Sequence, residues 1–319
     1  MYKLRDWIDI NKLDWGILSS NSNAIDMLEK NLDKINWCNL SCNINAIHIL
    51  QKNLDKVDWD YLSLNYNAIS ILEKNLDKIN WKWLSLNPNA IHILEKNLDK
   101  VSWVALSENK NAIHILEQNL DKIIWYKLSK NVNAIHILEK NLEKINYWSN
   151  LSGNPNTIHI LEQNQHKIDW ESLSENINAI HILEKNLDKI NWHMLSSNHN
   201  AIHILEKNLD KINWQFLSTN TNIHKIEIFN KKLEDYNYPI SWYLLCRNYN
   251  AIHIIEKNKD KINWLNISEN PSIFELDFDA LKKRCSIYKE ELIQKAMHPL
   301  RIQKYLDAGY DIYELDNLI

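Results

Sequence analysis

The stretch Trp192–Asn213, WHMLSSNHNAIHILEKNLDKIN, decides the fold because versions of it recur along most of the chain. A tryptophan opens each copy, at residues 15, 37, 59, 81, 103, 125, 148, 170, 192, 214, 242 and 264. Nine of the eleven steps between these tryptophans are 22 residues, one is 23 and one is 28. The chain is therefore a tandem repeat protein of twelve units, and the tryptophan is taken below as repeat position 1.

Each unit is expected to form two short helices. Repeat position 22 is Asn, Asp or Ser in most copies, which suits the N-cap of a first helix that starts at the tryptophan. Position 7 is always Asn and position 8 is Pro three times, which indicates an Asn N-cap and a second helix that starts there. That helix should end at a left-handed Asn in position 17, and the Leu in position 18 should fold back onto it.

Helices of about six and nine residues are not stable alone, so the units must stack and bury each other's apolar faces. The predicted fold is an all-α solenoid, a rod or superhelix of roughly 120 Å at about 10 Å per stacked layer, with the tryptophans in its core. The alternative is a leucine-rich-repeat-like solenoid, because L-D-K-I-N-W-x-x-L partly matches the leucine-rich pattern.

The repeats divide the chain into three predicted parts. Residues 1–14 form an N-terminal cap, residues 15–276 the repeat array, and residues 277–319 a helical C-terminal cap. The array is irregular at residue 147, a single insertion, and at residues 222–241, a longer break that is expected to bend the stack. The tail predicts two helices, one that ends near Met297 and one from Pro299 to Gly309.

Composition narrows the function classes. The net charge of −4 gives no global field that would hold nucleic acid or an anionic membrane, and the three glycines are too far apart for a phosphate-binding loop. The charged N-terminus lacks the apolar core of a signal peptide, and four cysteines suit thiols in a reducing compartment. We expect an intracellular protein that is not secreted, has no membrane span and no cofactor, and is not an enzyme, because no unrepeated acid, base and nucleophile occur together.

The segments NPNAI, LEKNLDKINW and WxxLSxN closely resemble the Asn- and Trp-rich tandem short repeats of uncharacterised proteins from giant DNA viruses. The tail MHPLRIQKYLDAGYDI also resembles a segment that recurs in those proteins. The resemblance covers nearly all of residues 15–276 and implies a viral protein, located in the host cytoplasm or the virion, with a scaffold or host-interaction role. It implies no catalytic residues. This chain departs from the family in having few prolines in position 8 and many histidines in position 12.

Histidine recurs in position 12, at residues 48, 92, 114, 136, 159, 181, 203 and 253. Equivalent residues of stacked repeats lie about 10 Å apart, too far to share a metal ion. A half-exposed helix position copied with the repeat explains the row better. The nearest approach to a metal cluster is His193, His199 and His203, of which the last two are spaced i,i+4. Cys38 and Cys42 have the same spacing but lack a second ligand pair.

Positions 2, 3, 6 and 8 vary between repeats and are free to make individual contacts. Repeats 3 and 4 place an apolar group there, namely Tyr61, Leu64, Tyr66, Trp83 and Leu86. Exposed, this group would be a partner-binding patch; the other interpretation is semi-buried packing between repeats. Lys in positions 16 and 20 runs beside Glu and Asp, so no nucleic-acid track is expected.

The predicted function is therefore a non-enzymatic repeat scaffold for a protein partner, host or viral. The alternatives are a self-assembling, homo-oligomeric virion component and metal binding through the histidine row.

Overall fold

The computed structural model describes residues 1–223 and 240–308. The chain forms two compact units, one of Asp6–Ile273 and one of Met1–Arg5 with the chain from Phe274 onward. Asp6–Ile273 contains the repeats, and within its described residues every regular element is helical. This confirms the all-α solenoid and excludes the leucine-rich-repeat alternative, which would place a strand in each repeat.

Each repeat has a first helix that starts at the tryptophan and a second helix that starts at the isoleucine of position 11. The first helices are α1 (Trp15–Leu18), α3 (Trp37–Cys42), α5 (Trp59–Leu64), α7 (Trp81–Leu86), α9 (Trp103–Leu106), α11 (Trp125–Leu128), α13 (Trp148–Gly153), α15 (Trp170–Glu175), α17 (Trp192–Ser197), α19 (Trp214–Leu217), α21 (Trp242–Arg247) and α23 (Trp264–Ile267). The described second helices are α2 (Ile25–Glu29), α4 (Ile47–Lys52), α6 (Ile69–Leu72), α8 (Ile91–Glu95), α10 (Ile113–Glu117), α12 (Ile135–Glu139), α14 (Ile158–Gln163), α16 (Ile180–Glu184), α18 (Ile202–Glu206) and α22 (Ile252–Lys257).

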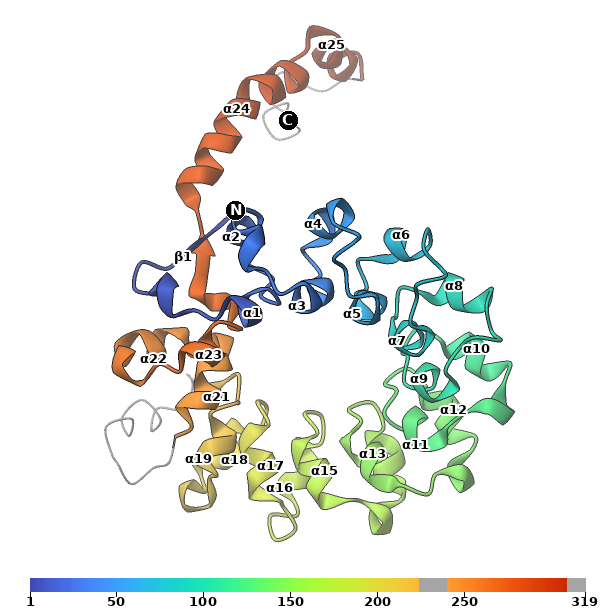
Figure 1. Cartoon of the computed structure of the whole chain (residues 1–319). Coiled ribbons are helices and arrows are strands. Elements are labelled where there is room, and N and C mark those ends of the chain that lie inside the picture. Colours follow the sequence, from blue (N-terminus) through green and yellow to red (C-terminus); the bar gives the residue numbers. More distant parts are fainter. Residues whose placement is uncertain (224–239, 309–319) are drawn as a thin grey trace. The chain divides into compact units, whose positions relative to one another are not determined.

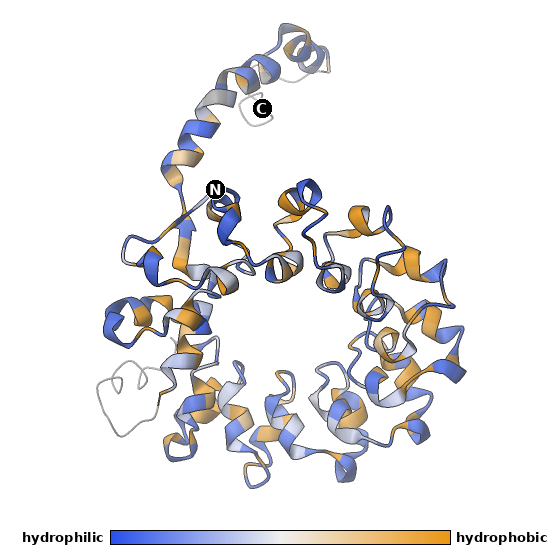
Figure 2. Ribbon diagram, viewed as in Figure 1, coloured by the Kyte–Doolittle hydropathy of each residue, from blue (hydrophilic) through white to orange (hydrophobic). Residues whose placement is uncertain are grey.

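Short 3₁₀ turns connect many of these helices. They are η1 (Ile10–Lys12), η2 (Leu32–Lys34), η3 (Leu120–Lys122), η4 (Leu142–Lys144), η5 (Gln165–Lys167), η6 (Leu209–Lys211), η8 (Tyr249–Ala251), η9 (Lys259–Lys261) and η10 (Pro271–Ile273). Apolar residues occur in every repeat around the array (Figure 2). The core is accordingly a continuous band in which positions 4, 10, 13, 14 and 21 are buried in nearly every described copy.

The first helices begin where the sequence predicts. In α5 the carboxylate of Asp58 accepts the backbone N–H groups of Asp60 and Tyr61 at 3.0 and 3.2 Å, as an N-cap does. Ile124 and Tyr147, which occupy the same place before α11 and α13, make no such bond. The Leu of position 4 is fully buried in each copy that has one, and so it fixes the helix against the core.

The second helices begin three residues later than predicted. The Asn of position 7 is not their N-cap: in repeat 2 the side-chain oxygen of Asn43 accepts the N–H of Asn45 at 3.1 Å and closes a local turn. The helix α4 then follows Ala46, which makes no side-chain cap bond. The side-chain oxygen of Asn43 is thus used by this turn, and its amide nitrogen donates to the carbonyls of Ser19 and Asn21 in the preceding repeat.

The predicted left-handed end of the second helix is also wrong. Asn53, in position 17, has φ −137°, and its side-chain amide donates to the carbonyl of Ile49 at 2.9 Å. This bond satisfies a helix-end carbonyl without a positive φ. The Leu of position 18 does not fold back either, since Leu54 is 36% exposed and its equivalents are similar.

A ladder of asparagine side chains joins every repeat to the one before it. In repeat 3, Asn65 donates its two side-chain N–H bonds to the carbonyls of Ser41 and Asn43, at 3.0 and 3.1 Å. All twelve residues in position 7 make the equivalent pair of bonds: Asn21, Asn43, Asn65, Asn87, Asn109, Asn131, Asn154, Asn176, Asn198, Asn220, Asn248 and Asn270. Each is buried, so the bonds are shielded from water.

The ladder closes on itself. Asn21 of repeat 1 donates to the carbonyls of Ser268 and Asn270 of repeat 12, at 3.0 and 3.1 Å. Asp6–Ile273 is therefore a closed ring of twelve repeats and not the predicted rod (Figure 1). Each repeat turns in the same direction relative to its neighbour, and twelve such turns bring the ends together.

Residues 6–14, here called the strap, complete the ring by supplying the missing half of repeat 12. In the strap, Lys12 lies 5.1 Å from the ring centre of Trp264, and the N–H of Asp14 donates to the Ser268 hydroxyl at 2.9 Å. Lys34 and Asn36 make the same contacts in repeat 1. The strap thus joins two repeats, where a cap over an exposed end had been expected.

The two irregularities leave the ladder intact. After the inserted Tyr147, Asn154 still donates to the carbonyls of Ser129 and Asn131. Residues 224–239 of the longer break, and the bend expected there, lie outside the described part of the chain. On its far side Asn248 bonds Ser218 and Asn220 at 3.1 and 2.9 Å.

The second unit contains a two-stranded antiparallel sheet, in which β1 (Tyr2–Leu4) pairs with β2 (Phe274–Leu276) and Lys3 lies opposite Glu275. Two helices follow, α24 (Phe278–Ala296) and α25 (Pro299–Asp307), in agreement with the two predicted for the tail. The helix α25 ends at Asp307, and Gly309 lies outside the described residues.

Candidate functional site

The first helices place the variable repeat positions on one side of the ring. In Figure 1 the helices α1, α3, α5, α7 and α9 lie toward the inside of the ring, and α2, α4, α6, α8 and α10 lie outside them. Positions 4 and 5 of the first helix are buried, so helical geometry turns positions 2, 3 and 6 to the opposite, inner side. Three of the four variable positions therefore share one surface.

The apolar group of repeats 3 and 4 lies on this surface. Tyr61 is 47% exposed and Trp83 37% exposed; Leu64 and Tyr66 are exposed as well, and Leu86 is half-buried. A cavity of about 340 Å³ brings three of the five together, and its lining is Cys42, Ile44, Leu64, Asn65, Tyr66, Leu86 and Pro88. Tyr61 and Trp83 do not line the cavity.

Polar groups beside this patch are engaged with their neighbours. The carboxylate of Asp60 accepts the side-chain amide of Asn80 at 2.9 Å. The ammonium of Lys82 lies 5.6 Å from the centre of the Trp83 ring, close enough for a cation–π interaction. The patch is therefore an aromatic surface whose adjacent charges are already partly satisfied.

A second apolar group on the same surface was missed by the sequence analysis. Tyr243, Tyr249 and Leu265 are each at least 50% exposed, and they occupy positions 2, 8 and 2 of repeats 11 and 12. A cavity of about 220 Å³ beside them is lined by Thr219, Thr221, Leu244, Arg247, Asn248 and Tyr249. The signal was available, because these residues also stand in variable positions.

The histidines of position 12 form pairs across repeats. In seven pairs, Nε2 of the imidazole lies close to a carboxylate oxygen of the Glu in position 15 of the preceding repeat. The distance is 3.5 Å in His48–Glu29. It is 2.5–2.9 Å in His92–Glu73, His114–Glu95, His136–Glu117, His159–Glu139, His181–Glu162 and His203–Glu184. Both side chains of these pairs are about half exposed, so each pair adds little to stability.

The three weak metal candidates are not brought together. His203 pairs with Glu184, whereas the ring of His193 stacks on Phe216 with centres 6.0 Å apart. The backbone carbonyl of His199 accepts the side-chain amide of Asn222. Across residues 1–223 and 240–308, no group of three or more His, Cys, Asp or Glu is arranged to hold a metal ion.

All four cysteines are free, and the thiol pKa is raised in Cys38, Cys42 and Cys246. Cys38 donates to the carboxylate of Asp58 at 3.3 Å, and this hydrogen bond is the main reason that the pKa of the Cys38 thiol is raised. Burial raises the pKa of Cys42 and of Cys246. Cys246 replaces the serine of position 5, and its sulfur accepts the N–H of Asn263 at 3.4 Å as the serine hydroxyls do elsewhere.

The tryptophan row is coupled to the lysines of position 20, a contact that the sequence analysis did not foresee. Most of the tryptophans are half-buried and not in the core, and the lysine ammonium lies 4.6–5.2 Å from the ring centre of the tryptophan. The lysine stripe is thus used within the ring, which explains a recurrent charge that spacing alone left unassigned.

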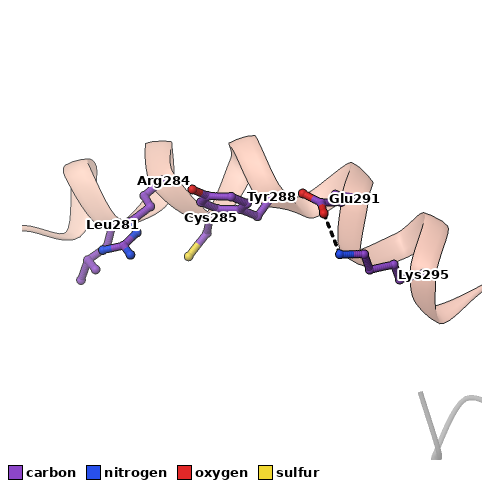
Figure 3. Close-up of a pocket in the computed structure, with 6 residues that line it drawn as sticks. All are labelled: Leu281, Arg284, Cys285, Tyr288, Glu291 and Lys295. Atoms are coloured by element: carbon purple, nitrogen blue, oxygen red, sulfur yellow. Dashed lines mark hydrogen bonds and ion pairs between the residues drawn. The ribbon is translucent and has the colours of Figure 1, made fainter.

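In the second unit, a cavity of about 540 Å³ lies against one face of α24 (Figure 3). Its lining is Leu281, Arg284, Cys285, Tyr288, Glu291 and Lys295. All six belong to a single helix, and Glu291 and Lys295 form an ion pair at 2.7 Å along it. This is an open helix face and not an enclosed site.

These features define the class of the protein: a closed ring of two-helix repeats with an inner surface of variable residues. Comparison with protein-family models, with curated proteins and with solved structures finds no match. Among the described residues, no helix is long and apolar enough to cross a membrane.

Proposed function

We propose that the ring is a non-enzymatic scaffold that binds a protein partner on its inner surface. The resemblance of its repeats to those of giant DNA viruses supports a viral protein that acts in the host cell or the virion. The partner is a host or a viral protein. Recognition consists of many modest contacts on a rigid array, with a few aromatic side chains contributing most of the affinity.

The exposed patch of Tyr61, Leu64, Tyr66 and Trp83 carries this proposal. The recurring residues of each repeat are used by the ring itself, as the buried position-7 asparagines and the capping residues show. The patch residues stand in positions that vary between repeats, yet all four expose large apolar side chains, and Leu64 and Tyr66 line a cavity. Tyrosine and tryptophan in such places are the residues most enriched among binding hot spots.

The ring also limits the shape of the partner. Twelve first helices packed at about 8–10 Å place their axes on a circle with a radius of roughly 15–19 Å. A single α-helix with its side chains is about 10–12 Å across and fits inside such a circle. The proposed partner therefore presents a protruding helix or extended segment, and not a broad flat face.

The test is a pull-down from infected-host lysate with wild type and a patch variant, Tyr61→Ser, Tyr66→Ser and Trp83→Ser. A matched control, Leu54→Ser, Leu76→Ser and Leu98→Ser, removes side chains of similar exposure from position 18. Circular dichroism and Tm establish that all three proteins are folded. We expect a specific protein to be retained by wild type and control and lost by the patch variant, and then to bind the purified ring directly. Retention of the same partners by the patch variant would overturn the proposal.

A further inference from the structure

The joint between repeats 12 and 1 differs from all others in the ring. At every other joint the polypeptide itself passes from one repeat to the next. Here the two repeats are held by hydrogen bonds, by the strap, and by the pairing of β1, which precedes the strap, with β2, which follows repeat 12. The bonds are those of Asn21 and one from Asn23 to the carbonyl of Pro271 at 3.1 Å. The ring can therefore open at this joint, and nowhere else, without breaking a covalent bond.

The strap is also a poorer partner than the segment it replaces. Every other repeat whose second half is described has a second helix before its connector, whereas the strap has only the turn η1. Within the described residues, the indole nitrogen of Trp7 is the only buried side-chain nitrogen or oxygen without a hydrogen-bond partner. A buried N–H without an acceptor disfavours the closed state relative to an open state in which water reaches it.

We propose that the strap and β1 form a latch, and that the ring opens at the joint between α23 and α1 when the strap leaves repeat 12 and β1 separates from β2. Opening admits a partner segment that has no free end, which a permanently closed ring could not encircle. This use of the latch rests on the proposed binding function; the opening itself does not. Local opening of this kind draws on the least stable contacts of a structure.

Hydrogen exchange tests the latch within one molecule. The N–H of Asp14 donates to Ser268 Oγ at 2.9 Å, and the N–H of Asn36, Asp58 and Asn80 make the same bond at 3.0 Å at covalent joints. We expect the Asp14 amide to exchange about tenfold faster than the three equivalents, because only its joint opens independently. Equal exchange at all four amides would overturn the proposal.

A second measurement separates fraying of the strap from opening of the ring. The measurement uses a variant in which Cys38, Cys42 and Cys285 are replaced by serine. Dyes attached at Ser20 and Glu269, which both occupy repeat position 6, span the joint between repeats 12 and 1. Dyes at Ser197 and Thr219 span a covalent joint in the same position. We expect a second, longer distance only for the first pair. A single distance for both pairs would mean that only the strap frays.

Matched substitutions then shift the opening. Asn23→Ala removes one hydrogen bond at the joint, and Asn111→Ala removes the equivalent bond to Pro88 at a covalent joint. We expect Asn23→Ala to raise the open population about fivefold, roughly the factor for one hydrogen bond, and Asn111→Ala to leave it unchanged. An equal response to both substitutions contradicts the latch. If the ring opens but no partner is captured, the binding function fails and the latch stands.

Discussion

At the scale of single residues, the asparagine of position 7 links each repeat to the one before it by two buried hydrogen bonds. Its oxygen closes a turn in its own repeat, and its two N–H bonds reach the repeat before it. Glutamine is too long for the turn and aspartate lacks the donors, which explains why the residue does not vary among the twelve copies. The sequence indicated an N-cap because its partners, 22 and 24 residues earlier, are adjacent only after the repeats stack.

Removing one rung of this ladder should be costly. In Asn109→Ala, the buried carbonyls of Ser85 and Asn87 each lose the hydrogen bond from Asn109, and the N–H of Asn111 loses its acceptor. We expect the free energy of unfolding to fall by about 2–3 kcal/mol, measured by urea denaturation. The control Asn111→Ala removes one exposed bond to Pro88 and should cost about 1 kcal/mol or less. Equal losses would show that burial does not set the strength of the ladder.

The raised pKa of Cys38 gives a second test at this scale. A raised pKa keeps the thiol protonated to a higher pH, so the thiolate that reacts with iodoacetamide is scarcer below that pKa. In Asp58→Asn the negative charge is gone, the pKa falls, and alkylation of Cys38 at pH 8 should become a few times faster. Asparagine is itself a good N-cap, so α5 is retained. An unchanged rate would show that Asp58 does not control this thiol.

At the scale of helices, local rules predicted the first helix well and the second poorly. The N-cap at position 22 was correct because capping depends on residues within one turn. The start of the second helix was wrong because the Asn of position 7 is committed to another repeat. Exposure of the inner patch was one of two predicted possibilities. Variability shows which positions are free to differ between repeats, but not whether they face solvent or a neighbouring repeat.

The first helix of repeat 6 offers a stabilising change. Ile124 precedes α11 with φ −94° and ψ 93°, a cap conformation without a side-chain bond. Ile124→Asp supplies the missing acceptor and should raise the free energy of unfolding by about 1 kcal/mol, detected as a higher Tm. Ile124→Ala, which shortens the side chain without adding an acceptor, is the control and should not stabilise the protein.

At the scale of the whole ring, Asp6–Ile273, closure could not be predicted from the sequence. Whether a solenoid becomes a rod or a ring depends on a small rotation per repeat, and no single residue encodes that angle. The resemblance of INKLD, residues 10–14, to the LDKIN connector was the available clue. It shows that the strap supplies the second half of a repeat whose first half comes at the end of the array.

The same pair of asparagine bonds is made at all twelve joints, which predicts that the ring tolerates a new break point. In a circular permutant, a two-residue Asn-Gly hairpin connects Leu276 to Tyr2, which face each other across β1 and β2. The new chain ends lie between Leu98 and Asp99. We expect helical content and tryptophan fluorescence like those of wild type, because every rung of the ladder is kept. The control opens the same permutant inside α9, between Ala105 and Leu106, and should unfold it.

Closure also constrains the gene. Nearly identical 22-residue units favour unequal recombination, which adds or deletes whole repeats, and an open solenoid absorbs such changes by growing or shrinking at its end. In this ring the last repeat must meet the strap, and each step is matched to one twelfth of a turn. Gain or loss of one repeat would leave the two ends out of alignment, so the geometry of closure fixes the number of repeats. Substitutions on the inner surface do not affect closure and remain free to accumulate.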